Sequence, residues 1–323
     1  MPIKIILPFI LLAVPWLVCS HSSMAGETVE DCHSVRFGEL DWTDLKAANA
    51  ISEVLLEQLG YRVTINKEVA SVDIMDHMAN GSVDVFLGYW KPSMDSVVQP
   101  YIDKQAVQIL SANMFDARYT LAVPQYVFDQ GVTRFEDLKA HKDKFNDRIY
   151  GLEKDTSGNR LIQDMIDQNA FELGGFKLVA TSEFLMLAQI KRRTRSNDWI
   201  VFLGWQPHPM NQHFDIAYLS GGQPYFGKNF GNASVYTLVR RGVSGRCQNL
   251  NRFLQNLKFP AATLEWIMDM VTNQFVPADR AARLWITQNP EYLSGWLEGV
   301  TQRSGKAINT SALLKNLELT HSM

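Results

Sequence analysis

One stretch of the sequence occurs twice. Residues 84–92 read DVFLGYWKP, and residues 200–207 read IVFLGWQP. Each copy is a short apolar run, rich in β-branched and aromatic residues, that leads into glycine, tryptophan and proline. This pattern predicts a buried parallel strand followed by a loop. Because α/β proteins bind ligands beyond the carboxyl ends of such strands, we expect Trp90 and Trp205 to face one another across a cleft and to hold a cation.

The rest of the chain alternates strands with helices, which predicts an α/β fold with a doubly wound sheet. A length of 323 residues with 46% hydrophobic content is enough for two cores. We expect one lobe over 26–115 and 213–323 and a second over 116–212, joined by a two-strand hinge. From residue 245 the pattern is mostly helical. The predicted strands cover 34–40, 62–69, 83–88, 108–114, 118–123, 148–152, 177–180, 199–205, 214–219 and 233–239.

The first 25 residues are typical of a signal peptide and not of the fold. Lys4 precedes an apolar run over 5–18 that is short for a membrane span, and Ser23-Met24-Ala25 has the small-x-small form of a cleavage site. We therefore expect residues 1–25 to be removed and the mature chain to be periplasmic. An alternative is a lipid anchor on Cys19, although the residues around Cys19 fit a lipoprotein signal badly.

Removal of the signal leaves two cysteines, Cys32 and Cys247, in a chain bound for an oxidising compartment. We predict that they form a disulfide bond. Such a bond would connect the start of the first lobe to the returning segment after the second lobe.

Four aromatic residues fall at loop positions after predicted strands or at the expected crossing between lobes. They are Trp42, Trp90, Tyr119 and Trp205. A quaternary ammonium has no N–H to donate, so it is held by aromatic faces and a carboxylate. Core packing remains the simpler interpretation for any single tryptophan. It is the one we prefer for Trp266, Trp285 and Trp296, which lie at helical spacing in the last part of the chain.

Polar residues near these aromatics are candidate ligand groups. Asp44 is a candidate counter-charge, or simply an acid in the first turn of a helix. Asp41 or Thr43 is a candidate cap for the same helix. Thr156, with Ser157 and Gly158 after it, places hydroxyls and N–H groups at the start of a predicted helix, which suits a polar or anionic end of the ligand or serves simply as a cap. His208 either contacts a ligand or lies in a surface loop.

Other functions find little support. The formal net charge of -3 provides no basic surface for nucleic acid. LSGGQ at 219–223 matches a signature of ABC-type ATPases, but the chain has no G-x-x-x-x-G-K-[ST] phosphate loop, so we interpret it as a glycine turn. Neither a G-x-S-x-G elbow nor an H-E-x-x-H metal motif is present, so we expect no catalysis, no cofactor and no metal.

These motifs together resemble one family: the periplasmic substrate-binding proteins of ABC importers for choline, glycine betaine and carnitine, and most closely the choline-binding proteins. The resemblance covers nearly the whole mature chain. It rests on residues 41–44 (DWTD), 85–92 (VFLGYWKP), Tyr119, 158–162 (GNRLI), 202–208 (FLGWQPH) and 225–227 (YFG).

The resemblance implies a two-lobed type II binding protein that closes on a trimethylammonium group. The cage would consist of Trp42 and Trp90 from one lobe with Tyr119 and Trp205 from the other, and Asp44 would accept a hydrogen bond from the choline hydroxyl. The protein would act as a monomer and deliver the ligand to an ABC permease.

One position departs from this family. Choline-binding proteins have asparagine where this chain has Thr156, which leaves the hydroxyl end of the ligand undetermined and makes carnitine or glycine betaine the alternative ligands. An alternative of another class is a secreted enzyme that acts on a choline ester. A sensor that uses the same site also remains open.

Overall fold

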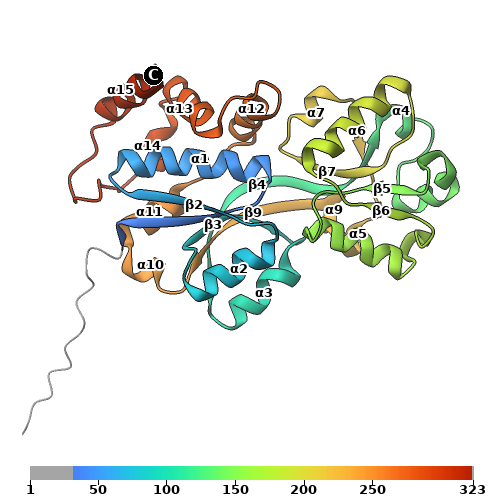
Figure 1. Cartoon of the computed structure of the whole chain (residues 1–323), viewed down its shortest axis with the longest axis horizontal. Helices are drawn as coiled ribbons and strands as arrows, with labels where there is room; N and C mark the ends of the chain where they lie inside the picture. The colour runs from blue at the N-terminus through green and yellow to red at the C-terminus, as the bar shows by residue number, and fades with distance from the viewer. Residues whose placement is uncertain (1–31, 322–323) are drawn as a thin grey trace, which may run out of the picture.

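A single mixed sheet runs through both halves of the molecule (Figure 1). The structure is a computed structural model that describes residues 32–321, so the predicted signal peptide and Cys19 lie outside the described residues. Within them the sheet has the order β2-β1-β3-β9-β4-β7-β5-β6, and β8 pairs with β4. The strands are β1 (Ser34–Glu39), β2 (Arg62–Lys67), β3 (Val85–Lys91), β4 (Val107–Pro124), β5 (Arg148–Tyr150), β6 (Lys177–Val179), β7 (Phe202–Gln206), β8 (Ile216–Tyr218) and β9 (Asn232–Arg240).

Helices cover both faces of this sheet, and the last of them pack together on the side of the first lobe (Figure 1). They are α1 (Thr43–Gln58), α2 (Ser71–Asn80), α3 (Asp95–Asp103), α4 (Gln125–Phe128), α5 (Ser157–Asp167), α6 (Glu183–Ser196), α7 (Met210–His213), α8 (Gln223–Phe226), α9 (Lys228–Gly231), α10 (Val243–Arg246), α11 (Gln248–Asn256), α12 (Ala261–Thr272), α13 (Ala278–Gln288), α14 (Tyr292–Trp296) and α15 (Thr310–His321), with 3-10 segments η2 (Phe135–Phe145) and η3 (Ala170–Glu172).

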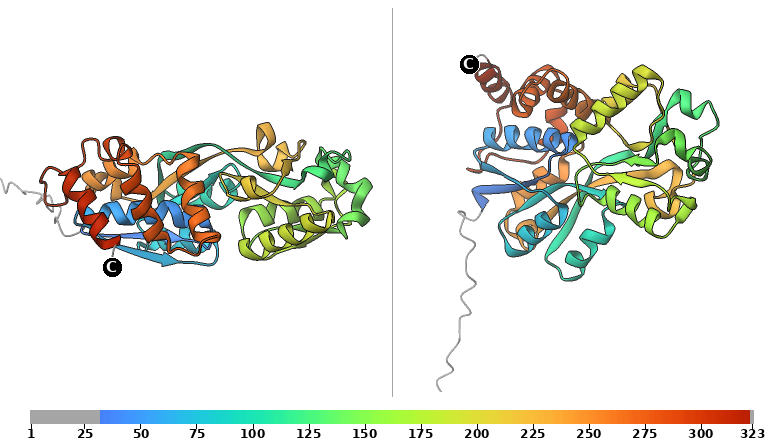
Figure 2. Two further views of the ribbon diagram at one scale, coloured as in Figure 1. Left: turned by 90° about the horizontal axis from the view of Figure 1, so that it is seen from above. Right: turned by 45° about the vertical axis from the view of Figure 1, so that its right-hand side comes forward.

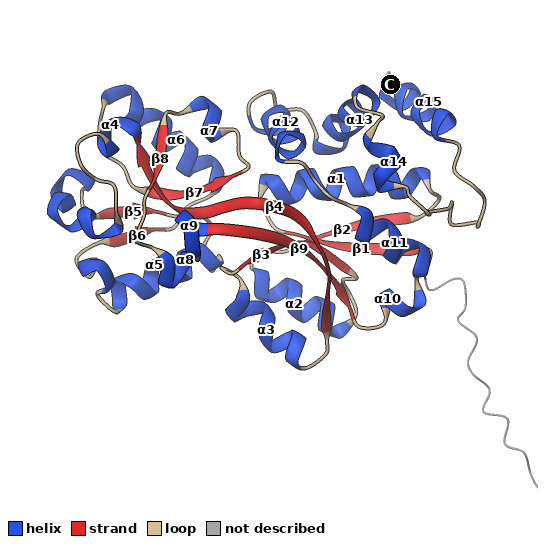
Figure 3. Cartoon of the chain, turned by 180° about the vertical axis from the view of Figure 1, so that it is seen from behind, coloured by secondary structure: helices blue, strands red, loops and turns tan. Residues whose placement is uncertain are grey.

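The predicted two-lobed α/β fold is confirmed. The first lobe holds β1, β2 and β3, which pair in parallel, and the second holds β5, β6 and β7, which also pair in parallel. Between them β4 and β9 run antiparallel from one lobe into the other (Figure 3). Figure 2 shows the two lobes side by side with these strands joining them. Two strands that cross together form the hinge on which such a molecule closes.

The first crossing strand differs from the sequence prediction. The predicted break between 108–114 and 118–123 is wrong, because β4 continues from Val107 to Pro124. Its pairing with β9 shifts register between Met114 and Ala117, where Asp116 has φ of 55°. A β-bulge thus accommodates the residues that interrupt the hydrophobic pattern, and the strand bends without ending.

The second crossing bears on the lobe boundary. β8 pairs with β4 at 122–124, inside the second lobe, and β9 begins only at Asn232. We therefore propose that the chain returns to the first lobe at about residue 232 and not at 213. The sequence predicts the strand at 214–219 but not its pairing with β4 inside the second lobe, and the proposed boundary at about 232 rests on that pairing.

The disulfide bond between Cys32 and Cys247 is confirmed and joins residues 215 apart in the chain. It ties the start of β1 to the segment between α10 and α11. Among the described residues, no helix combines the length and apolar character needed to cross a membrane.

Candidate functional site

Four aromatic side chains line one small cavity where the two lobes meet. They are Trp42, Trp90, Tyr119 and Trp205, the four that the sequence singled out, and each is less than 10% exposed. About 310 Å³ between the walls is unfilled by protein atoms, part of it open to solvent. Asp44, Leu152 and Ser157 complete the lining. We call this set of seven residues the cage.

Strand ends bring the rings together. Trp42 lies between β1 and α1, Trp90 near the end of β3, and Trp205 near the end of β7. Tyr119 on β4 is the register partner of Trp205, so the two side chains share one face of the sheet. The rings of Trp90 and Tyr119 lie 5.7 Å apart between centroids, so the cage closes across the lobes. The two copies of the repeated stretch end alike, each with a cis peptide bond to its proline.

Asp44 is the acid of the cage. It lies in the first turn of α1, and its Oδ2 accepts a hydrogen bond of 3.0 Å from the indole Nε1 of Trp90. Burial, and then the negative charge of Glu183, raise the pKa of Asp44 to about 6, although the bond from Trp90 opposes this shift. A cation in the cavity would favour the ionised carboxylate. Asp44 can therefore both orient Trp90 and balance a positive ligand.

A second buried carboxylate, that of Glu183 on α6, lies behind the cage. It accepts hydrogen bonds from Thr43 of the first lobe, at 3.2 Å from the backbone N and 2.5 Å from Oγ1. His208 Nε2 lies 3.1 Å from Glu183 Oε1. Because His208 Nδ1 accepts the N–H of Met210 at 2.9 Å, we assign the ring proton to Nε2, which donates to Glu183. The negative charge of Glu183 lies close to Asp44 and raises the pKa of Asp44.

His208 therefore takes neither role that the sequence suggested. It is 1% exposed and packs its ring edge against that of Trp205, with centroids 4.5 Å apart. It supports a cage wall from behind and is not among the residues that line the cavity.

The hydroxyl of Tyr119 is held by the start of α5. The side chain of Ser157 and the backbone N–H of Gly158 both form hydrogen bonds with it, and burial raises the pKa of Tyr119 above its ordinary value. Thr156 caps the helix, with Oγ1 accepting from the N–H of Asn159 at 3.4 Å. The side chain that reaches the cavity from this loop is that of Ser157, so a ligand role for Thr156 stays a prediction.

Three residues at the site have a weaker sequence signal. Ser157 belongs to the helix start that the sequence marks as a place for a polar ligand end, whereas only its place after β5 marks out Leu152. Glu183 carries no signal at all, because its partner Thr43 lies 140 residues away. A contact between lobes cannot be read from local periodicity.

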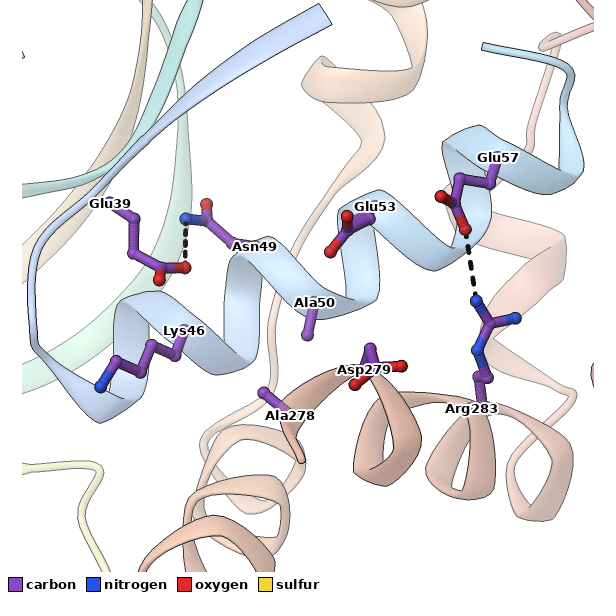
Figure 4. Close-up of a pocket in the computed structure, with 9 residues that line it drawn as sticks. All are labelled: Glu39, Lys46, Asn49, Ala50, Glu53, Glu57, Ala278, Asp279 and Arg283. Atoms are coloured by element: carbon purple, nitrogen blue, oxygen red, sulfur yellow. Dashed lines mark hydrogen bonds and ion pairs between the residues drawn. The ribbon is translucent and has the colours of Figure 1, made fainter. Parts of the chain in front are cut away.

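A second hollow lies between α1 and α13 (Figure 4). Its lining is charged and lacks any aromatic ring: Glu39, Lys46, Asn49, Ala50, Glu53, Glu57, Ala278, Asp279 and Arg283. Glu57 pairs with Arg283 at 3.2 Å, and Asn49 donates to Glu39 at 3.2 Å. Within residues 32–321, no group of three or more His, Cys, Asp or Glu side chains is placed to hold a metal ion. The aromatic cage is thus the better candidate for a ligand site.

Hydrogen bonds join the lobes at several places, among them Gln212 of α7 with Glu265 of α12 at 3.0 Å and the two bonds that follow, so the molecule is in a closed arrangement. Thr43 of α1 bonds to Glu183 of α6, and Arg160 Nη2 of α5 donates to Ser71 Oγ of α2 at 3.3 Å.

Known proteins provide an independent comparison. Residues 33–288 match the family model for the substrate-binding domain of ABC-type glycine betaine transport systems (OpuAC). The fold is similar to that of an ABC-transporter choline-binding protein in complex with choline, with 40% sequence identity and a TM-score of 0.85. That match covers 89% of this chain and 99% of the other. A choline-binding protein in an unliganded semi-closed conformation, also 40% identical over 88% and 98% of the two chains, gives a TM-score of 0.79. The higher score for the choline complex agrees with the closed arrangement.

A curated relative is similar over part of its length. The glycine betaine/carnitine transport binding protein GbuC of Listeria monocytogenes is 24% identical over 178 residues. The match covers 55% of this chain and 58% of GbuC.

Proposed function

Because the chain belongs to the substrate-binding domains of ABC-type glycine betaine transport systems, we propose that it captures choline and delivers it to an ABC permease. The family consists of transport proteins and not of enzymes, which removes the alternative of an enzyme acting on a choline ester. The binding of a small quaternary ammonium compound follows from the family and from the similar choline complex. The choice of choline is the proposal.

The observation that carries it is the cage, in which four rings and one buried carboxylate surround one small cavity. A trimethylammonium group presents only C–H bonds and a diffuse positive charge, which suit ring faces. Each desolvated ring contributes about 0.5 to 2 kcal/mol, so the rings together with methyl burial are compatible with a micromolar dissociation constant, about -8 kcal/mol.

The charges favour choline over glycine betaine or carnitine, which carry a carboxylate. The cavity lining includes Asp44 and, among the described residues, no Lys or Arg. The buried carboxylate of Glu183 adds a second negative charge nearby. A ligand carboxylate would meet these charges without a cationic partner, which is unfavourable in a site shielded from water. A choline hydroxyl meets no such penalty.

Glycine betaine or carnitine remains the alternative because of one local feature. Ser157 lines the cavity at the start of α5, where the helix dipole favours an anionic end. The likeness to GbuC supports the same alternative.

Calorimetric titration of the mature protein with choline, glycine betaine, carnitine and acetylcholine tests the choice. We expect choline to bind with a micromolar or lower dissociation constant and at least about tenfold more tightly than glycine betaine or carnitine. Tighter binding of either zwitterion would replace choline with that compound.

We also propose that the protein acts as a periplasmic monomer once the signal peptide is removed. Its likeness to extracytoplasmic binding proteins supports the location. Cell fractionation, with light scattering of the purified protein, measures both. A membrane-bound fraction that acyl-chain removal releases would support the alternative anchor at Cys19.

A further inference from the structure

The N-terminus of α1 has no side-chain cap of its own. Trp42 occupies the capping position without a side-chain hydrogen bond, and Asp41 pairs with Lys46. The N–H of Thr43 instead donates to a carboxylate oxygen of Glu183 on the other lobe, at 3.2 Å. Acceptors at a helix start are favoured by the unpaired N–H groups and by the helix dipole. The second lobe thus supplies the cap that the first lobe lacks.

The same carboxylate also fixes the opposite wall of the cage. Glu183 Oε1 accepts both Thr43 Oγ1 at 2.5 Å and His208 Nε2 at 3.1 Å. His208 packs against Trp205, whereas Thr43 lies between Trp42 and Asp44 in the sequence. The carboxylate of Glu183 therefore connects Trp205, through His208, to the segment that carries Trp42 and Asp44.

We propose that Glu183 is a positioning residue that captures the start of α1 when the lobes close, and thereby holds the ligand in the cage. The proposal deepens the function proposed above and rests on it. Glu183 does not line the cavity, so it acts through Thr43 and His208 and not on the ligand. In an open molecule the two lobes separate, and both Thr43 and Glu183 return to water.

The direction of the effect follows from when these bonds form. They exist only after closure, so they slow opening more than they speed the first encounter with the ligand. Hydrogen bonds to a charged acceptor are among the stronger ones in proteins, and removal of the one from the Thr43 hydroxyl should accelerate dissociation by about tenfold.

The test uses three variants of the full mature protein. Thr43→Val removes the hydroxyl with little change of volume, and Thr43→Ser keeps it. Ser71→Ala is the matched control, because it removes a different bond between the lobes, the one from Arg160, which joins no cage residue. Stopped-flow tryptophan fluorescence gives the association and dissociation rates of choline. Spin labels at Lys191→Cys on α6 and Arg280→Cys on α13, both exposed positions, report lobe distances with and without ligand.

We expect Thr43→Val to dissociate about tenfold faster, with an association rate within about threefold of the wild type, and to lose part of its short-distance population. Thr43→Ser should restore most of the slow dissociation and most of the short-distance population. Equal dissociation rates and equal distance distributions in the wild type and Thr43→Val would overturn the proposal. So would a loss in Ser71→Ala as large as that in Thr43→Val, because any contact between lobes would then suffice.

The ligand proposal fails separately. If the wild type binds glycine betaine or carnitine in place of choline, the choice of choline is wrong, and the rates are measured with the compound that binds. If none of these binds, the spin-label distances of the ligand-free proteins still decide whether Thr43→Val opens more readily.

Discussion

Asp44 shows how one residue serves both structure and charge. Its carboxylate accepts a hydrogen bond from the indole N–H of Trp90, and it lies buried in a cavity suited to a cation. Burial raises its pKa to about 6, and a bound cation would lower that pKa again because it stabilises the ionised form. Binding of choline should therefore release protons when the pH is near or below 6.

The first prediction concerns the pH dependence of affinity. With a pKa of about 6, only about a tenth of Asp44 is ionised at pH 5, so we expect choline to bind up to about tenfold more weakly at pH 5 than at pH 7.5. Asp44→Asn should bind more weakly at pH 7.5 and show a flat profile. Calorimetry at the two pH values measures both. A wild-type profile as flat as that of Asp44→Asn would contradict the role of this carboxylate.

The stability of the ligand-free protein should depend on pH in the opposite direction to the affinity for choline. The pKa of Asp44 is raised in the folded state above its ordinary value of 3.8, so the folded state binds the proton more tightly. The contribution of this group to the free energy of unfolding is then largest at low pH and is lost as the pH rises through about 6. The rise in melting temperature produced by saturating choline should accordingly be larger at pH 7.5 than at pH 5.

A pair of tryptophans separates affinity from stability. Trp205 lines the cavity, whereas Trp285 on α13 packs among helices of the first lobe, 5.8 Å from Trp296 and 4.9 Å from Tyr292 between ring centroids. Trp205→Ala should weaken choline binding by about 1 to 2 kcal/mol, since a ring face is lost. Trp285→Ala should lower the free energy of unfolding by about 3 to 5 kcal/mol and leave the affinity of the folded protein nearly unchanged.

Calorimetric titration and urea unfolding of both variants, with Trp90→Ala beside Trp205→Ala, provide the measurement. An unchanged dissociation constant for choline in both cage variants would show that choline does not bind in this cavity.

Among the elements, α5 determines where Tyr119 lies. Gly158 in its first turn approaches this ring so closely that a Cβ added there would lie 2.8 Å from Tyr119 Cζ and closer still to the hydroxyl and to Leu203. Its N–H also bonds to that hydroxyl. The residues at a helix start thus position a ring on a neighbouring strand.

This contact gives the third prediction. Gly158→Ala should displace the ring of Tyr119 from its place in the cage and weaken choline binding by about tenfold, because the added Cβ would overlap with this ring and with the fully buried Leu203. Ser157→Ala is the matched variant, since it removes a hydroxyl from the same turn without adding an atom. Its effect on affinity should be smaller, and an equal or larger effect would show that the hydroxyl, and not the position of the ring, governs binding.

The elements also show what the sequence can and cannot specify. Local hydrophobic patterns are enough to predict the strands β1, β3, β7 and β9 and the three cage tryptophans, because strand ends place these rings by a general rule. Tyr119 lies inside β4 and was predicted from its place beside the expected crossing between the lobes. The bulge in β4 was misread as a break, since Asp116 interrupts the pattern without ending the pairing. The carboxylate of Glu183 was missed because its significance depends on how two lobes meet, which is a property of the closed molecule and of no single segment.

At the scale of the whole molecule, the cage exists only when the lobes are together. Trp42 and Trp90 belong to the first lobe and Trp205 to the second, while Tyr119 lies on the strand that connects them. The hinge strands β4 and β9 are continuous through both lobes, so closure is a bend and not a rearrangement of the sheet. The disulfide bond lies apart from this motion, because it joins two segments of the first lobe.

The last prediction follows from that separation. Cys32 precedes β1 and Trp42 follows it, so six residues of strand, ~20 Å, stand between the disulfide and the cage. In the double variant Cys32→Ser/Cys247→Ser the unfolded chain gains the entropy of a loop of over two hundred residues, worth up to about 5 kcal/mol in the chain-entropy model. We expect the free energy of unfolding in urea to fall by up to this amount, and the choline affinity to stay within about twofold of the wild type. Urea unfolding of the oxidised and reduced wild type, which should differ by the same amount, is the control. A large loss of affinity in the folded double variant would mean that the bond shapes the cage and not only the stability of the first lobe.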